Sequence, residues 1–216
     1  MSENNPAVLF SAYLPPVEYI AALFSHTPAF IEQHEHFQKQ TCRNRCHIYS
    51  ANGLLKLSIP IRHGHTAHMK IRDVKISYDS DWQKIHWRSI ESSYRCSPFF
   101  EYYEEYFAPF FTRKTEFLFD LNQELLDVIL RLLKHPEGYS YTDSFVKSLP
   151  EGTADYRNLI RPKASDAAQV KTMHDREYQQ VFGNKYGFLP NLSILDLMFN
   201  EGPQATGYLK NSWLKV

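Results

Sequence analysis

The chain of 216 residues has the length of one domain, because single hydrophobic cores grow to about 250 residues before chains divide. Its 43% hydrophobic and 22% charged residues are typical of a globular protein and exclude a disordered or fibrous one. Lysine plus arginine equals aspartate plus glutamate at 24 each, so the overall charge favours neither nucleic acid nor an anionic membrane as a partner. We therefore expect one globular domain over residues 1–216.

The amino terminus and the cysteines bear on location. Residues 1–6 are polar and lack the cationic start of a signal peptide. The longest apolar runs are a few residues, whereas a spanning helix needs about 20. Cys42, Cys46 and Cys96 make an odd number of thiols, which does not suit a disulfide framework. These features predict a cytoplasmic protein with free thiols and no membrane contact.

The first segment predicts a βαβ unit. Residues 7–10 form a short apolar run, and Pro15-Pro16 suits the first turn of a helix. Residues 29–31 then predict a second strand. Open α/β sheets bind ligands at the carboxyl ends of their strands, so the turn at 13–16 is a candidate binding segment. The apolar positions of the helix are Val17, Ile20, Leu23 and Phe24.

A β-hairpin is predicted over residues 45–61. Asn52-Gly53 is a preferred two-residue turn, and the residues on both sides alternate between apolar and polar. Centring the strands on this turn gives a specific register. It places Ser50 opposite Leu55, Ile48 opposite Leu57 and Cys46 opposite Ile59.

The rest of the chain predicts a further strand and several helices. Residues 69–76 favour a strand whose apolar phase changes midway. Helices are expected from about 82 to 94, from 97 to 109, from 120 to 133 and from 191 to 200. Asp120 and Gln123 resemble a capping box. Residues 137–168 predict a loop-rich connection with one short strand near 139–146. The predicted fold is a mixed α/β sheet, opening with the βαβ unit and adding the hairpin, with helices around it.

The charges are unevenly spread along the chain. Residues 39–95 hold 11 lysines and arginines against 4 acidic residues, while residues 101–127 hold 7 acidic residues against 2 basic ones. Arg43 and Arg45 are two apart, so in an extended segment both project to one side and suit a phosphate or carboxylate, with Asn44 on the other side. Oppositely charged faces that pair with each other are the simpler explanation.

Histidines and thiols supply further candidates. His63, His65 and His68 have spacings that a metal could use, but they lie in a predicted loop without nearby carboxylates, so we expect no metal. His86 shares a helix stripe with apolar residues, which fits either a core histidine or a general base. Cys42 has cationic neighbours but is more simply a buried thiol. No cofactor-binding motif is recognised.

Several motifs follow one another along the chain in a distinctive order. They are Ser11 to Tyr19, Gln38-Lys39-Gln40, Arg43-Asn44-Arg45, Asn52-Gly53 with Leu57 to Pro60, Trp82 with His86-Trp87, Tyr94 with Ser97-Pro98, Asn191 to Leu197, and Phe199 to Pro203. Their order resembles the WbqC-like protein family, and the resemblance extends over nearly the whole chain apart from 137–168. It implies acyl or aminoacyl transfer to amino sugars in bacterial O-antigen synthesis.

Together these observations predict a transferase acting on an activated amino sugar or a related anionic metabolite. Tyr13 and the arginines would bind the anion, Asn44 would orient the substrate, and His86 would act as general base. Asp196 is an alternative acid or orienting residue, although its motif also suits helix packing. The expected partner is a nucleotide sugar or acyl donor, with no cofactor.

Two other functions remain open. The first is a non-catalytic protein that keeps the binding site without the chemistry. The second, less favoured, is binding of single-stranded nucleic acid by the basic hairpin and its aromatic neighbours.

Overall fold

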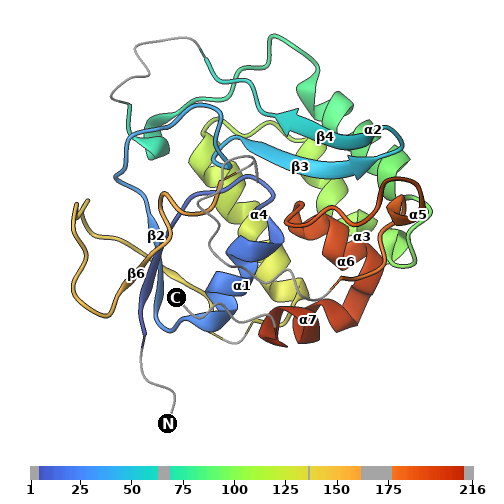
Figure 1. Ribbon diagram of the computed structural model, residues 1–216. Helices are drawn as coiled ribbons and strands as arrows, with labels where there is room; N and C mark the ends of the chain where they lie inside the picture. Colours follow the sequence, from blue (N-terminus) through green and yellow to red (C-terminus); the bar gives the residue numbers. More distant parts are fainter. Residues whose placement is uncertain (1–4, 63–68, 136, 162–176, 212–216) are drawn as a thin grey trace.

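The computed structural model describes residues 5–62, 69–135, 137–161 and 177–211 (Figure 1). It confirms the mixed α/β fold, with a four-stranded parallel sheet, a separate antiparallel hairpin and helices around them. No helix in these ranges is long and apolar enough to cross a membrane. The parallel sheet has the order β5-β2-β1-β6, formed by β5 (Ser140–Tyr141), β2 (Ala29–Glu32), β1 (Ala7–Phe10) and β6 (Ala154–Asp155).

The predicted βαβ opening is confirmed. Strand β1 is followed by helix α1 (Val17–Ser25), and β2 returns parallel to β1 with Ala7 opposite Ala29. All four β1 residues are buried, which fits a central parallel strand covered on both faces. The turn between β1 and α1 therefore starts at the carboxyl edge of the sheet, as expected.

The two edge strands come from the segment expected to be loop-rich. The short strand predicted near 139–146 is β5, which pairs with β2. Strand β6 pairs with β1 and was not predicted. Its two residues are too few to show any periodicity, so only the partner strand defines it.

The hairpin is present, but its predicted register is wrong by two residues. Strands β3 (Arg45–Ser50) and β4 (Gly53–Ser58) place Ser50 opposite Gly53. The turn residues are Ala51 and Asn52, and Gly53 takes a φ of 92° that closes the loop. The Ser50 hydroxyl donates to the Gly53 carbonyl and accepts from the Asn52 N–H, which favours this shorter pairing. Ile48 then faces Leu55, and Cys46 faces Leu57.

The strand predicted over residues 69–76 is also wrong. This segment contains a 3₁₀ turn, η2 (Ile71–Asp73), and makes isolated bridges rather than a ladder. Ile61 bridges to Ile76, and Lys75 bridges to Phe117. The change of apolar phase in the sequence marks this turn, because a continuous strand would keep one phase.

The four predicted helices are confirmed with shifted ends. The capping box predicted at Asp120 and Gln123 is wrong. The helix that it was expected to start begins at Leu118, and the Gln123 side chain donates to the Ser11 hydroxyl. The short helices near the carboxyl terminus were not predicted. Besides α1 and η2, the described helices are α2 (Trp82–Tyr94), α3 (Phe100–Phe107), η3 (Ala108–Phe111), α4 (Leu118–Leu132), α5 (Gly183–Tyr186), α6 (Ile194–Glu201), η4 (Gly202–Gln204) and α7 (Ala205–Asn211).

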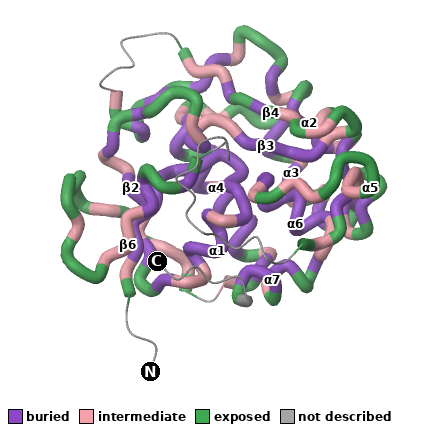
Figure 2. Tube along the Cα trace, viewed as in Figure 1, coloured by how far each residue is buried: buried purple, intermediate pink, exposed green. Residues whose placement is uncertain are grey.

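The core joins the helices to both sheets (Figure 2). Phe199 of α6 is fully buried, with the rings of Tyr94, Phe100 and Phe107 within about 6 Å of its own. Gly202 follows at the end of α6 with a φ of 54°, and a Cβ atom there would lie 2.5 Å from the Phe99 ring. This packing fixes α6 and the segment before it, which forms one wall of the candidate site.

Candidate functional site

The two arginines expected to share one ligand have different surroundings. Arg43 is only 2% exposed, and its Nε and Nη2 atoms donate to the Glu35 carboxylate at 2.8 and 2.5 Å. Its guanidinium lies 4.6 Å from the centre of the Phe10 ring and also donates to the Arg157 carbonyl. These contacts use the donors of Arg43 within the fold, so a ligand would have to displace a buried partner.

Arg43 belongs to a network of ion pairs beside the carboxyl edge of the parallel sheet, in which all members but the half-exposed Asp155 are buried. Arg157 donates to Asp155 at 2.6 and 2.8 Å, and lies 3.7 Å from Glu32, which ends β2. Arg157 also donates to the carbonyl of Val146. This network fills the edge where open α/β sheets usually bind a ligand. We call it the sheet-edge network (Glu32, Glu35, Arg43, Asp155, Arg157).

Arg45 and Asn44 lie on the hairpin instead. The Arg45 Nε donates to the Ser58 hydroxyl across the ladder at 2.9 Å, and the residue is partly exposed. The Asn44 side chain donates to the Ile59 carbonyl at 2.9 Å, while its buried Oδ1 atom has no hydrogen-bond partner among the described residues. Arg45 therefore keeps its terminal guanidinium nitrogens available at the surface.

Tyr13 and His86 form a buried pair. The Tyr13 hydroxyl and His86 Nδ1 lie 2.9 Å apart in a hydrogen bond. Burial lowers the pKa of His86 to about 4, although a hydrogen bond to the Ser58 backbone opposes this, so the imidazole is neutral at pH 7. The Tyr13 backbone N–H donates to the Cys42 carbonyl, which joins the β1–α1 turn to the segment before β3. The structure thus brings Tyr13, Arg45 and His86 together around Ser58.

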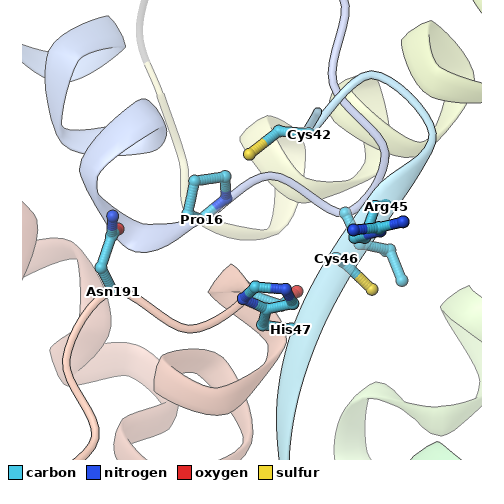
Figure 3. A pocket seen from close by; sticks show the side chains of 8 residues that line it. Pro16, Cys42, Arg45, Cys46, His47 and Asn191 are labelled. Atoms are coloured by element: carbon cyan, nitrogen blue, oxygen red, sulfur yellow. The ribbon is translucent and has the colours of Figure 1, made fainter. Parts of the chain in front are cut away.

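A small pocket opens beside this group, between the β1–α1 turn, β3 and the segment before α6 (Figure 3). We call it the β3 pocket. It is a shallow recess, because its empty space of about 210 Å³ includes the open solvent at its mouth. Its lining residues are Leu14, Pro16, Cys42, Arg45, Cys46, His47, Asn191 and Ser193.

His47 is the residue in this pocket that the sequence did not single out. It is 8% exposed, and its buried Nε2 atom has no hydrogen-bond partner among the described residues. Burial lowers the pKa of His47 to about 4, and the nearby charges of Lys56 and Arg45 act in the same direction. Figure 3 shows its ring between Asn191 and β3. A neutral imidazole with a free nitrogen is able to bond to a ligand group.

Backbone hydrogen bonds hold the walls of the β3 pocket together. The Ser193 N–H donates to the His47 carbonyl at 2.8 Å, and the Val17 N–H donates to the Leu192 carbonyl at 2.9 Å. Leu14 and Asn191 take positive φ values of 40° and 53°, which are uncommon for residues other than glycine. Strained residues of this kind often mark functional sites, because the surrounding structure must stabilise them.

The two thiols form an apolar part of the wall. Cys42 and Cys46 are both buried. Burial raises the pKa of Cys42 to about 12, and it raises the pKa of Cys46 as well. Both remain protonated at pH 7, so neither has the thiolate that a nucleophile requires. Cys96 is exposed and does not line the pocket.

Asp196 is not among the residues lining the pocket, although its backbone N–H donates to the carbonyl of the lining residue Ser193 at 2.9 Å. Its Oδ2 atom accepts hydrogen bonds from Tyr178 at 2.6 Å and from Gln180 at 2.8 Å. Burial raises the pKa of Asp196 to about 6, although these bonds and the Tyr94 hydroxyl oppose the shift. The side chain is fully buried in the first turn of α6. Its contacts hold the residues around Gln180 onto α6.

Nothing in the described ranges suggests a metal ligand set. His63, His65 and His68 lie outside the described residues. In the ranges that are described, no three histidine, cysteine, aspartate or glutamate side chains could hold a metal together. The chemistry available at the β3 pocket is that of one guanidinium and one neutral imidazole.

Comparison with known proteins agrees with the motif order. The model of the WbqC-like protein family matches residues 11–148 and 157–208. The chain is 28% identical to "Uncharacterized protein Rv1507c" of Mycobacterium tuberculosis, over 94% of this chain and 96% of that protein. No solved structure matches the chain. The matched segments include all three walls of the β3 pocket.

Proposed function

Because this chain belongs to the WbqC-like protein family, we propose that it is a transferase acting on an activated amino sugar or a related anionic metabolite. The proposed reaction moves an acyl or aminoacyl group to the sugar amine in the synthesis of bacterial surface polysaccharide. The observation that carries the proposal is the β3 pocket, whose lining includes both Arg45 and His47, a histidine whose Nε2 atom has no hydrogen-bond partner among the described residues.

The electrostatics of the pocket support an anionic substrate. Arg45 is partly exposed and holds its Nε on Ser58, which orients the guanidinium while leaving its two terminal nitrogens free to bind oxygen atoms. The neutral His47 adds a hydrogen-bonding atom without adding charge. A carboxylate, a phosphate or a developing oxyanion is the group that such a pair stabilises.

The chemistry needs only proton transfer at the reacting amine. The amine nitrogen attacks the carbonyl carbon of the donor, a C–N bond forms, and the bond between that carbon and the leaving group breaks. The amine loses one proton, which His47 passes to the leaving group. His47 suits this role because it lines the pocket and its Nε2 atom has no hydrogen-bond partner among the described residues.

The other residues predicted for the site have structural roles around the pocket. His86 is buried and bonded to Tyr13, which favours a positioning role for the β1–α1 turn over direct contact with substrate. Arg43 stabilises the sheet-edge network. Asn44 keeps β3 and the residue after β4 in register. Asp196 anchors the residues near Gln180 to α6.

Thermal unfolding with a ligand panel tests the binding half of the proposal. The panel contains nucleotide amino sugars, acyl-coenzyme A compounds and free nucleotides. A ligand at 100 times its Kd should stabilise the native chain by about 2.7 kcal/mol. We expect this shift with a nucleotide amino sugar, and its loss in Arg45→Gln. Arg88→Gln is the matched control, because Arg88 is an exposed arginine on α2 that does not line the pocket.

Mass spectrometry of the same mixtures tests the chemistry. We expect the amino sugar to gain the mass of the acyl group with the unaltered chain, and a loss of product of at least tenfold in His47→Gln. Binding without any product would instead support the non-catalytic alternative. The absence of both binding and product would contradict the proposal.

A further inference from the structure

We infer that residues 181–189 form a flap that lifts from β3 and admits the sugar part of the substrate to a groove beneath it. We call this segment the β3 flap. The inference rests on the proposed function and deepens it, because it states how a sugar reaches a site whose open part is only a shallow recess.

One side of β3 continues from the β3 pocket to the flap. Side chains alternate along a strand, so Arg45, His47 and Tyr49 project to the same side. Arg45 and His47 line the pocket, whereas Tyr49 is fully buried and bonded to the flap. The residues opposite them on β4 are all exposed: Ser58, Lys56 and Leu54. Lifting the flap would therefore extend the row of Arg45 and His47 by an aromatic ring.

Hydrogen bonds to backbone carbonyls attach the flap to the hairpin. The Tyr49 hydroxyl lies 2.8 Å from the Gly187 carbonyl and 3.2 Å from the Phe182 carbonyl, which follow and precede α5. Two side chains of α5 donate to the Ala51 carbonyl in the hairpin turn, at 3.0 and 3.1 Å. Figure 1 shows α5 near this end of β3. Water can replace such polar partners once the flap lifts, so the net cost of breaking each bond is modest.

The flap buries little of its own surface. Every residue from 181 to 190 is half-buried or exposed, whereas every residue from 192 to 199 is buried. Figure 2 shows exposed residues around α5 and buried ones along α6. Segments with few buried apolar contacts open at a lower free energy than the core. The flap should therefore lift while β3 and α6 stay folded.

Gln180 closes the flap at its base. Its Nε2 atom donates to the Leu189 carbonyl at 2.9 Å, and its Oε1 atom accepts from the Leu189 N–H at 2.8 Å. The same Nε2 atom donates to the buried Asp196 carboxylate at 2.8 Å. Beyond the flap, the Ser193 N–H donates to the His47 carbonyl. Both ends of the flap are thus fixed to the body of the chain, and the residues between them form the part that moves.

The groove under the flap suits a sugar ring. An uncovered Tyr49 ring would present a flat apolar face in line with the guanidinium and the imidazole, and such a mixture is typical of small-molecule sites. In the closed chain the rings of Phe182 and Tyr186 lie against Tyr49, with centres 5.7 and 6.4 Å from its own. A sugar that replaces them would keep the anionic part of the substrate at Arg45.

Hydrogen–deuterium exchange of the full chain tests the flap without a ligand. The backbone amides of 183, 185, 187 and 189 are hydrogen-bonded in the closed flap. A helix as short as α5 does not persist in water once it is detached, so lifting exposes these amides. Tyr49→Phe should raise the exchange of all four by about fivefold, the usual effect of one lost hydrogen bond, and should leave α6 unchanged.

Two further variants complete this experiment. Tyr186→Phe should have a smaller effect on the same amides, because its hydroxyl shares the Ala51 carbonyl with Lys185. Tyr139→Phe is the matched control, since it removes a hydroxyl that is bonded to Asp127 instead, and it should leave the flap unchanged. If the flap amides exchange no faster than those of α6, or if Tyr49→Phe raises both equally, the flap opens only by global unfolding and the inference is overturned.

UDP-glucosamine and UMP then separate the sugar from the nucleotide. We expect UDP-glucosamine to raise exchange in the flap, because the bound sugar keeps it from closing, and UMP to leave it unchanged. An equal effect of UMP, or stabilisation by UDP-glucosamine with unchanged flap exchange, would overturn the inference while the proposed function stands. If UDP-glucosamine neither stabilises the chain nor yields product although the variants release the flap, the proposed function is overturned, and the sugar assigned to the groove fails with it.

Discussion

Arg43 of the sheet-edge network and Arg45 of the β3 pocket are only two residues apart in the chain, yet their surroundings differ. Arg43 is enclosed by Glu35, Phe10 and the backbone of Arg157, and nearly all of its surface is buried. Arg45 keeps part of its surface exposed at the mouth of a pocket whose histidine has a free nitrogen. Spacing along the chain therefore did not decide which arginine can meet a ligand.

The difference lies in how far each region satisfies its own polar groups. Buried charges are tolerated only when they are paired and hydrogen-bonded, as they are at the sheet edge. The β3 pocket instead leaves polar atoms available, and groups of this kind are typical of binding sites. The comparison predicts that substitutions in the first region will affect stability, whereas those in the second will affect ligand binding.

Arg43→Ala should have the largest effect on stability. Removing the guanidinium leaves Glu35 buried without its partner, which should lower the free energy of unfolding by about 3–5 kcal/mol. Urea unfolding of the variant and the unaltered chain measures this difference. The double variant Arg43→Met with Glu35→Leu should recover a large part of the loss, because it removes the unpaired charge. A loss below 1 kcal/mol in Arg43→Ala would contradict the division between the two regions.

His86 should make stability depend on pH. Its pKa is about 4 in the folded chain and about 6.5 when unfolded, so the unfolded chain binds more protons between these values. Stability should therefore fall as pH drops from 6.5 to 4, by about 3 kcal/mol from this residue. The part of this pH dependence that comes from His86 should be absent in His86→Gln.

The contribution of His86 is the difference between two curves of stability against pH, one for the unaltered chain and one for His86→Gln. Asp196 has its pKa raised to about 6, so it contributes with the opposite sign and lowers stability as pH rises from about 4 to 6. The difference between the chain and His86→Gln cancels that contribution. An unchanged slope in His86→Gln would show that the histidine is not held neutral by burial.

His47 should make a smaller contribution to the pH dependence of stability, and His47→Gln should remove it. Its pKa is lowered in the same direction, but the ring borders a pocket that is open to solvent, so we expect about 1–2 kcal/mol between pH 6.5 and 4. Unfolding measured at several pH values tests this. The same variant should lose ligand binding, which His86→Gln should weaken less. An equal loss of binding in both variants would place His86 in contact with the ligand.

Arg45→Ala should have the smallest effect on stability, within about 0.5 kcal/mol, because surface substitutions away from buried partners rarely cost more. Its effect on ligand binding should nevertheless be the largest of the set. Denaturation and ligand titration of the same preparation measure the two quantities together. A stability loss as large as that of Arg43→Ala would show that Arg45 is a structural residue.

The sequence could predict most of the local structure near the site. Apolar runs and prolines identified β1, α1 and β2, and the alternation around Asn52-Gly53 identified the hairpin. The hairpin register was missed because the Ser50 side chain, rather than the turn dipeptide, sets the pairing. His47 was missed because a histidine on the polar side of a hairpin carries no local signal of its surroundings.

The sequence by itself determined the α/β class, the βαβ opening, the hairpin and the family, since each rests on residues close together in the chain or on the order of motifs. Only the tertiary structure decided that Arg43 pairs with Glu35 beneath Arg157, and that residues 191–193 close the pocket over His47. The physical reason is that burial depends on segments distant in the chain: Arg157 lies 114 residues from Arg43, and Ser193 bonds to His47 from the other end of the chain. Those partners decide whether a polar side chain stabilises the fold or remains free to bind a ligand.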